Sequence, residues 1–245
     1  MSRVLFVTGT NTEVGKTAVT AAVAALAVRA GLRTAVLKPG QTGVAPGEPG
    51  DAEEVARLLG GAPLTTRELV RYPEPLSPER AALRSGMPFL TIPQFIDAVD
   101  DLTDSHDLVL VEGAGGLLVR YDAEGLTLAD LAQSVTGAEL LLVAHPGLGT
   151  LNTVTLTAEA LRARKVATAG VVIGSWPSEP DLATRCNLAD LPVAAGAPLL
   201  GALPTGAPAA GPGFTELAAV SLAPALGGRW DAAAFTQAFA VPFAG

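Results

Sequence analysis

The chain has 245 residues, of which 49% are hydrophobic and 16% charged, and 16 Lys+Arg against 24 Asp+Glu give a formal net charge of −8 at pH 7. The apolar fraction excludes a disordered chain, and the acidic balance argues against a nucleic-acid-binding protein, because that affinity comes mainly from Lys and Arg on phosphates. The single cysteine, Cys186, excludes an internal disulfide and a thiolate-rich zinc site and is typical of a reducing cytosol.

The apolar fraction does not indicate a membrane protein. Aromatic residues make up only 4% of the chain, while glycine and alanine are abundant. The most apolar run, residues 18–28, is shorter than the ~20 residues that span a bilayer. Glu13 and Gly15 stand where a signal peptide needs a basic region. We therefore expect a soluble, cytoplasmic protein that contacts neither membranes nor nucleic acid.

Short apolar runs alternate with helical patterns along most of the chain. In chain order these predict a strand over 4–8, a helix over 17–30, a strand over 34–37, a helix over 51–59 and a proline-rich loop over 73–78. They continue as a helix over 92–102, a strand over 108–111, a helix over 127–135, a strand over 139–144, a helix over 151–163 and a strand over 167–173. Residues 188–228 are dense in Ala, Gly and Pro, and predict only a last strand near 199–203 before loops and terminal helices.

Strands that alternate with helices predict an α/β fold, with a mostly parallel central sheet and helices on both faces. The strands are continuously apolar, as expected for strands buried on both sides. No polar linker divides the chain, so we expect a single P-loop-type domain over residues 1–245.

The most specific feature is a phosphate-binding loop that joins the first strand to the first helix. It begins at Gly9 and ends in Gly15-Lys16-Thr17, with five residues between the two glycines where the usual P-loop has four. Backbone N–H groups and the helix dipole would bind phosphates there, Lys16 would reach the outer phosphates, and the Thr17 hydroxyl would ligate Mg²⁺. The predicted nucleotide contacts of this loop are Glu13, Val14, Gly15, Lys16, Thr17 and Ala18.

Two acids are candidates for the same metal ion. Glu112 ends a strand of four apolar residues and meets a glycine-rich turn that includes Gly115, a further predicted nucleotide contact. A P-loop needs such an acid at the end of a neighbouring strand. Asp51 follows a flexible Gly/Pro segment at a helix start, where its position fits an ordinary N-cap equally well.

Lys38 follows the second predicted strand. Ligands of open parallel sheets bind outside the carboxyl ends of the strands, so Lys38 should project toward the same crevice as Lys16 and Glu112. Two lysines and a metal ion around one phosphate indicate stabilisation of a transferred phosphoryl group. Without the other motifs, a surface lysine at a strand end remains an alternative.

Together these motifs resemble the dethiobiotin synthetase family. The resemblance rests on residues 8–17, on Lys38-Pro39 with Thr42-Gly43, on residues 111–116 and on residues 148–152, and it covers residue 3 to about 205. The five-residue spacing of the phosphate loop is typical of this family.

The resemblance implies that 7,8-diaminononanoate, CO₂ and ATP react to give dethiobiotin, ADP and phosphate in biotin biosynthesis. One amine forms a carbamate, ATP phosphorylates it to a carbamic-phosphoric anhydride, and the second amine closes the ring. Lys16 and Lys38 would be catalytic. The resemblance further implies that Mg²⁺ is held by Thr17, Asp51 and Glu112, and that substrate is contacted by Thr12, Thr42 and Asn152.

Members of this family act as homodimers in which the partner subunit holds the carboxylate of the substrate. Residues 148–152 match that part of the family pattern, and the start of the following helix could offer N–H groups to a carboxylate. Ordinary helix capping by Thr150 and Asn152 is the alternative that residue types alone allow.

The chain departs from the family at the nucleotide base. Many members have an asparagine that reads adenine after the strand that corresponds to 169–173, where this chain has Gly174, Ser175 and Trp176. Backbone groups there and in the turn Pro204-Thr205-Gly206 remain candidates for base contacts. We therefore expect weak discrimination between ATP and other nucleoside triphosphates.

Three other functions share part of this pattern. A partition-type ATPase usually has Lys-Gly-Gly early in the loop, where this chain has Thr10 and Asn11 after Gly9. An amidotransferase-like ligase of cobalamin synthesis needs a nucleophilic cysteine at a glycine-rich turn, which Cys186 lacks. A pure nucleotide-binding module would show no turnover with the diamine and bicarbonate.

Overall fold

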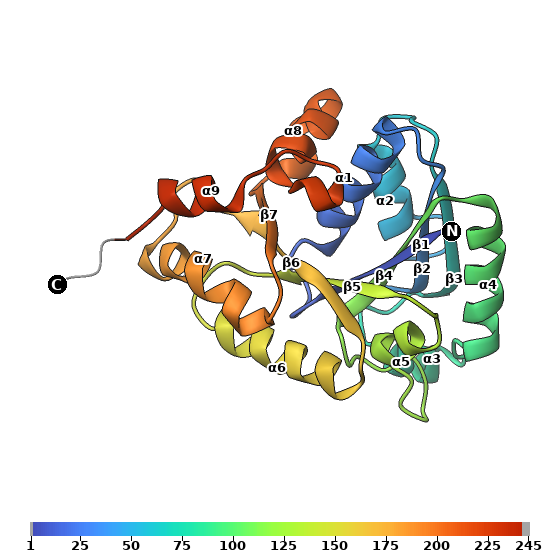
Figure 1. Cartoon of the computed structure of the whole chain (residues 1–245). Helices are drawn as coiled ribbons and strands as arrows, with labels where there is room; N and C mark the ends of the chain where they lie inside the picture. The colour runs from blue at the N-terminus through green and yellow to red at the C-terminus, as the bar shows by residue number, and fades with distance from the viewer. Residues whose placement is uncertain (1, 242–245) are drawn as a thin grey trace.

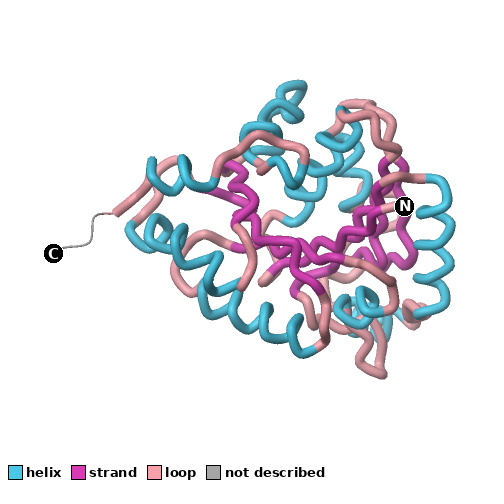
Figure 2. Tube along the Cα trace, in the orientation of Figure 1, coloured by secondary structure: helices cyan, strands magenta, loops and turns pink. Residues whose placement is uncertain are grey.

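The fold is built on one parallel sheet with helices on both faces. The computed structural model describes residues 2–241. Within these residues, the sheet has seven strands in the order β3-β2-β4-β1-β5-β6-β7, and every neighbouring pair is parallel. Figures 1 and 2 show the sheet in the middle of the molecule and helices on either side of it. The predicted α/β class with a parallel sheet is confirmed.

The elements have the following bounds. The strands are β1 (Arg3–Gly9), β2 (Thr34–Thr42), β3 (Thr65–Tyr72), β4 (Leu108–Gly116), β5 (Glu139–Ala144), β6 (Ala167–Trp176) and β7 (Leu199–Pro204). The α-helices are α1 (Lys16–Arg29), α2 (Asp51–Leu58), α3 (Pro78–Ser85), α4 (Ile92–Ser105), α5 (Leu128–Gln133), α6 (Thr150–Ala163), α7 (Leu182–Ala195), α8 (Phe214–Ser221) and α9 (Ala232–Ala238). Two 3₁₀ helices are η1 (Ala207–Gly213) and η2 (Pro224–Leu226).

Alternate residues of the central strands pack into two different apolar cores. In β1, Leu5 and Val7 belong to the core under α1, α2 and α8, whereas Val4 and Phe6 belong to the core under α4 and α5. Because both faces of the sheet are covered, strand residues are apolar at consecutive positions rather than at every second one. This burial explains why the central strands are recognisable as short apolar runs in the sequence.

The predicted elements up to residue 173 are confirmed within a few residues, but three elements were missed. Strand β3 is an edge strand of mostly polar residues, so it shows no apolar run. Helix α3 begins with Pro78 at its first turn, the end of what the sequence predicted to be a loop. Helix α7 contains Pro192, near the start of the segment that the sequence left largely unassigned.

Aromatic residues hold the C-terminal part of the chain against the sheet. Trp176, at the end of β6, lies 5.1 Å from Phe235 and 5.0 Å from Phe239 of the α9 region, between ring centroids. Trp230 lies 5.2 Å from Phe235. The guanidinium of Arg185 donates to the carbonyl oxygens of residues 239 and 240. The last strand, β7, and the terminal helices are therefore parts of the same packed structure, and the strand predicted near 199–203 is confirmed.

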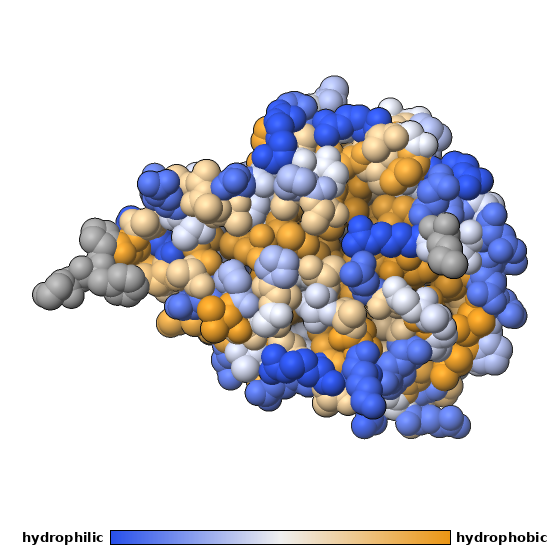
Figure 3. Space-filling model, viewed as in Figure 1, coloured by the Kyte–Doolittle hydropathy of each residue, from blue (hydrophilic) through white to orange (hydrophobic). Residues whose placement is uncertain are grey.

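Hydrophilic side chains lie on the surface, as expected for a chain with 16% charged residues. Figure 3 shows hydrophilic residues gathered over the side that α4 covers. No helix within residues 2–241 is both long enough and apolar enough to cross a bilayer. Residue 1 and residues 242–245 of the predicted domain lie outside the described residues.

Candidate nucleotide and diamine site

The predicted site residues gather around a cavity of about 780 Å³ at the carboxyl ends of β1, β2 and β4. Its volume is in the range of small-molecule binding sites. The predicted residues that line it are Thr12, Glu13, Gly15, Lys16, Thr17, Ala18, Lys38, Thr42, Asp51 and Gly115. The parallel sheet thus brings together motifs that are up to about a hundred residues apart in the sequence.

The loop after β1 has the backbone conformation of an anion-binding nest. Glu13 has φ 60° and Gly15 has φ 94°, both in the left-handed region, and α1 begins immediately afterwards at Lys16. Left-handed residues turn neighbouring N–H groups toward one point, which the positive end of α1 also faces. The Lys16 ammonium donates to the carbonyl oxygen of Asn11 at 3.1 Å, across the loop. The loop is thus shaped for phosphate groups.

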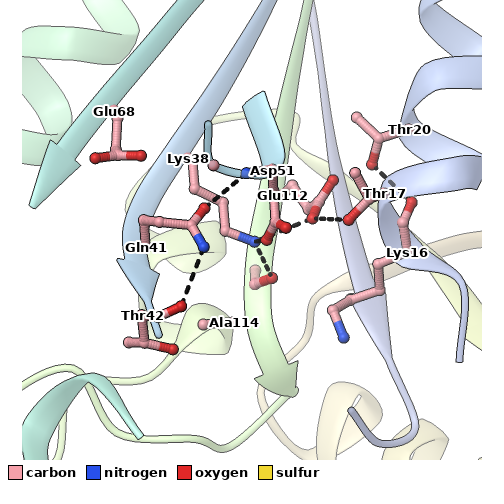
Figure 4. A network of polar contacts seen from close by, with 12 residues as sticks. Lys16, Thr17, Thr20, Lys38, Gln41, Thr42, Asp51, Glu68, Glu112 and Ala114 are labelled. Carbon is pink, nitrogen blue, oxygen red and sulfur yellow. Dashed lines mark hydrogen bonds and ion pairs between the residues drawn. The ribbon is translucent and has the colours of Figure 1, made fainter. Parts of the chain in front are cut away.

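Buried Lys38 is the centre of a group of charges (Figure 4). Its side chain is 3% exposed, and its ammonium donates to Asp51, to Oε1 of Glu112 at 3.0 Å and to the carbonyl oxygen of Gly113 at 3.2 Å. The Thr17 hydroxyl donates to the same Glu112 oxygen at 2.9 Å. Residues from β2, α1, α2 and β4 therefore meet at one ammonium and one carboxylate.

The two lysines have opposite electrostatic environments. Burial lowers the pKa of Lys38, but the carboxylates of Glu112 and Asp51 more than offset that effect, so its pKa lies above the ordinary value. Burial, together with the nearby charge of Lys38, lowers the pKa of Lys16, and Glu112 and Asp51 only partly offset this. Lys38 is thus a fixed cation, whereas Lys16 lacks an anionic partner until a ligand supplies one.

Asp51 is not the N-cap of α2, the alternative that its sequence position allowed. Gly50 is the capping residue, and Asp51 is the first residue of the helix. The backbone N–H of Asp51 donates to Oε1 of Gln41 at 2.9 Å, and the Asp51 carboxylate accepts from the Lys38 ammonium. The structure therefore supports the other hypothesis, an acid that points into the site.

Other predicted residues lie outside the lining of this cavity. Glu112 is buried beneath it, and Val14 is buried in the core behind the loop. The Ser175 hydroxyl pairs with the Thr205 hydroxyl at 2.8 Å, at the ends of β6 and β7. Asn152 lies exposed in the first turn of α6. The remaining base-site candidates are Gly174, Pro204 and Gly206.

Gly174 lies directly behind the phosphate loop. A Cβ added at Gly174 would lie 2.0 Å from the carbonyl oxygen of Val14, and one added at Gly15 would lie 2.6 Å from the carbonyl oxygen of Gly174. Only two residues without side chains allow this close backbone contact between the loop and β6.

Sequence reasoning missed several residues around the cavity. Pro75, Leu76 and Ser77 line it from the segment that was predicted only as a loop, and Gln41 was given no role. Gln41 is 4% exposed. The position of Gln41 next to Thr42, a predicted substrate contact, is the sequence feature that could have indicated a role for Gln41 in the site.

The chain was compared with known proteins. Residues 3–212 match a family model described as an AAA domain. The ATP-dependent dethiobiotin synthetase BioD of Saccharopolyspora erythraea is 63% identical over 93% of this chain and 99% of its own length. The enzyme of the same name from Streptomyces avermitilis is 61% identical over 96% of this chain and 98% of its own length.

The chain belongs to the dethiobiotin synthetase family. This membership confirms the resemblance that the phosphate loop, Lys38 and Glu112 indicated.

Solved structures place the dethiobiotin synthetase fold among P-loop ATPases. The cell division ATPase MinD of Pyrococcus furiosus superposes with a TM-score of 0.55 at 18% identity, over 89% of each chain. A ParA family ATPase from Chlorobium tepidum gives a TM-score of 0.53 at 12% identity, over 83% of this chain and 84% of its own. At these identities the likeness shows the fold alone, so it does not favour a partition function.

Gly174→Ala should damage the phosphate loop. The added methyl group must displace the backbone of Val14, which we expect to cost about 2 kcal/mol and about 5 °C in Tm. Nucleotide affinity should fall at least ~10-fold, measured by calorimetric titration. Gly213→Ala is the matched control, because Gly213 has φ −82° and open space around its Cβ position. An unchanged Tm and affinity for Gly174→Ala would contradict this packing.

Lys38→Met should destabilise the protein by about 3 kcal/mol at pH 7, because it leaves the buried Glu112 carboxylate without its cation. The raised pKa of Lys38 means that its stabilising contribution is complete below the unfolded pKa of about 10.4 and is lost only as pH rises through the folded value. The difference in unfolding free energy from wild type should therefore stay constant between pH 7 and about 9. Urea denaturation across that range measures it, and a difference that disappears by pH 9 would contradict the assignment.

Lys16→Met should have the opposite effect on stability. Its pKa is lowered, so charged Lys16 costs stability at pH 7, and wild-type stability recovers only as pH rises from the lowered value toward about 10.4. We expect the ligand-free variant to melt about 2 °C above wild type at pH 7, while its stabilisation by ATP is lost. Thermal scans with and without ATP give both quantities, and a lower ligand-free Tm would show that Lys16 is stabilising.

Proposed function

We propose that the chain catalyses the ATP-dependent closure of 7,8-diaminononanoate and CO₂ to dethiobiotin, with release of ADP and phosphate. The observation that carries the proposal is the set of contacts that join buried Lys38 and Glu112 to Asp51 and Thr17, beside the cavity that the phosphate loop lines. The 63% identity to a dethiobiotin synthetase over nearly its whole length supports the reaction assigned to this site.

The reaction has three steps. An uncharged amine of the substrate attacks CO₂ and loses a proton, which gives a carbamate. A carbamate oxygen attacks the γ-phosphorus of ATP, the bond to the ADP oxygen breaks, and a carbamic-phosphoric anhydride forms. The second amine then attacks the carbonyl carbon and loses a proton, and phosphate leaves as the ring closes. Each step develops negative charge on oxygen atoms of the carbamate or of the phosphates, so fixed positive charge is what the protein must supply.

Lys38 and Lys16, which both line the cavity, supply that charge. Lys38 cannot move far, because three acceptors hold its ammonium, so it offers a fixed positive position for the carbamate oxygens. Lys16 binds only the carbonyl oxygen of Asn11 through its ammonium and can turn to a migrating phosphoryl group. Catalysis would rest on orientation and electrostatics rather than on a protein nucleophile.

The residues around Glu112 fit a magnesium ion. Oε2 of Glu112 is buried and has no hydrogen-bond partner, which leaves one carboxylate oxygen available to a cation. Thr17 and Asp51 offer two more oxygen ligands at the cavity wall. Within the described residues no group of three or more His, Cys, Asp or Glu side chains could hold a metal, and P-loop Mg²⁺ takes most of its ligands from phosphates and water. When bound, Mg²⁺ would neutralise charge on the β- and γ-phosphates.

The substrate contacts and the dimer belong to the same proposal. Thr12 and Thr42 line the cavity and would contact the diamine or its carbamate. Asn152 would contact the substrate carboxylate of the partner subunit's site. Leu148 at 91% exposure and Leu156 at 58% lie before and within α6, where a second copy of the chain would cover them. We propose this homodimer, one domain per chain and a cytoplasmic location.

The base site would depend on backbone contacts. Near the ends of β6 and β7 the hydroxyls of Ser175 and Thr205 bind each other. Neither Gly174 nor Gly206 has a side chain that could form hydrogen bonds to a nucleotide base. We therefore propose weak preference among nucleoside triphosphates.

Turnover tests this function. Phosphate release should require diaminononanoate, bicarbonate and Mg²⁺ together, and CTP or GTP should support a rate within about tenfold of ATP, the range of one weak hydrogen-bond difference. Lys38→Ala should lose at least ~1,000-fold in rate, because a charge-stabilising contact of this kind is worth several kcal/mol. Phosphate release that does not depend on the diamine would indicate a switch-type ATPase instead, and strict ATP dependence would contradict the base-site proposal.

A further inference from the structure

Asp51 reaches the site at the end of a loop that has no regular structure. Residues 43–50 join β2 to α2, contain three glycines and two prolines, and are mostly exposed. Gly43 and Gly47 both have positive φ. A loop of this composition has many accessible conformations, yet the carboxylate that follows it must meet Lys38 within hydrogen-bond distance.

Arg71 of the edge strand β3 binds this loop. Its guanidinium donates to the carbonyl oxygens of Ala45 at 3.3 Å and Glu48 at 2.5 Å. Glu68, three residues earlier on the same strand, accepts two hydrogen bonds from Arg71 at 2.6 and 3.0 Å, and Glu53 of α2 lies 3.5 Å away. The side chains of Arg71 and Glu68 are only 20% and 16% exposed. Arginine presents five donors in a rigid plane, which is what simultaneous contact with a carboxylate and two carbonyl groups requires.

Gln41, on the strand beside Arg71, binds the backbone of Asp51. Gln41 and Arg71 are register partners in the β2–β3 pair. In the side chain of Gln41, Oε1 accepts from the backbone N–H of Asp51 at 2.9 Å. The Nε2 amino group of the same side chain donates to the carbonyl oxygen of Thr42 at 3.2 Å (Figure 4). A Cβ added at Gly50 would lie 2.9 Å from Oε1 of Gln41 and 3.1 Å from Nη2 of Arg71. Gly50 is therefore enclosed by the same two side chains, one residue before Asp51.

We propose that Arg71 is a positioning residue that fixes the loop over residues 43–50 and thereby sets the Asp51 carboxylate for its ligand. This inference rests on the proposed function, in which Asp51 helps to hold Mg²⁺. Arg71 acts through the carbonyl groups of the loop backbone, and it is not among the residues that line the cavity. Loss of the guanidinium would release two carbonyl groups of the loop, so Asp51 would occupy its bound position for a smaller fraction of the time.

The test is metal binding in the complete chain. Mn²⁺ affinity is measured by electron paramagnetic resonance in the presence of a nonhydrolysable imido analogue of ATP, for wild type, Arg71→Met, Arg71→Lys and Asp51→Asn. Arg67→Met is the matched control, because Arg67 lies on the same strand and pairs with the exposed Asp101. Turnover is recorded beside binding as kcat and KM.

Arg71→Met should weaken Mn²⁺ binding about tenfold and leave the affinity for the metal-free analogue unchanged, while Arg67→Met matches wild type. In the Asp51→Asn background, Arg71→Met should weaken Mn²⁺ binding by less than twofold, because the residue it positions is already gone. Arg71→Lys keeps the charge but not the planar fork, and should give an intermediate loss. If Arg71→Met does not fold, Arg71→Lys is compared with wild type in its place.

Three results would overturn the proposal. Arg71 variants that bind Mn²⁺ as wild type does would remove its positioning role and leave the role of Asp51 intact. An equal tenfold loss in the Asp51→Asn background would show that Arg71 acts elsewhere. Wild-type Mn²⁺ affinity in Asp51→Asn itself would overturn the metal role of Asp51 in the proposed function, and the positioning role with it.

Discussion

The site depends on a buried ammonium that is held by two carboxylates. Lys38, Glu112 and Asp51 come from β2, β4 and the start of α2. The side chains of Lys38 and Glu112 are 3% and 1% exposed, so burial of either charge without the other would be unfavourable, whereas Asp51 is 37% exposed. The parallel order of β2, β4 and β1 is the arrangement that meets this requirement, because it puts the carboxyl ends of the three strands side by side. The same edge carries the phosphate loop, where burial, and after it the charge of Lys38, lowers the pKa of Lys16 and so disfavours its charged form until a phosphate arrives.

Small residues and close backbone contacts hold the phosphate loop and the segment before Asp51 in place. Gly15 and Gly174 allow the phosphate loop to lie directly on β6, and Gly50 fits between Gln41 and Arg71. Helix α1 is almost fully buried and rich in alanine, which lets it pack closely on the sheet behind the loop. The alanine-rich run that could have suggested a membrane segment is thus the helix that presents Lys16 and Thr17. The net charge of −8 describes the surface, while the site combines two lysines with two acids.

The sequence predicted the central strands and the position of Lys16 beside the cavity because each has a strong local signal. Continuous apolar runs mark strands that are buried on both faces, and the Gly15-Lys16-Thr17 sequence between strand and helix marks the phosphate loop. Edge strand β3 has neither signal, because its polar residues face solvent and the loop that carries Asp51. The contacts of Arg71 and Gln41 arise from sheet register between β2 and β3, which residue types alone do not reveal.

In the proposed reaction, Lys38 and the phosphate loop stabilise a carbamate that becomes phosphorylated. If a carbamate oxygen attacks ATP and phosphate later leaves from the carbonyl carbon, that oxygen must end in the released phosphate. Turnover with diaminononanoate, ATP and ¹⁸O-labelled CO₂, sampled before the label exchanges with water, should therefore give phosphate that contains one ¹⁸O atom, detected by mass spectrometry. Unlabelled phosphate would mean that water attacks ATP, and would contradict the account.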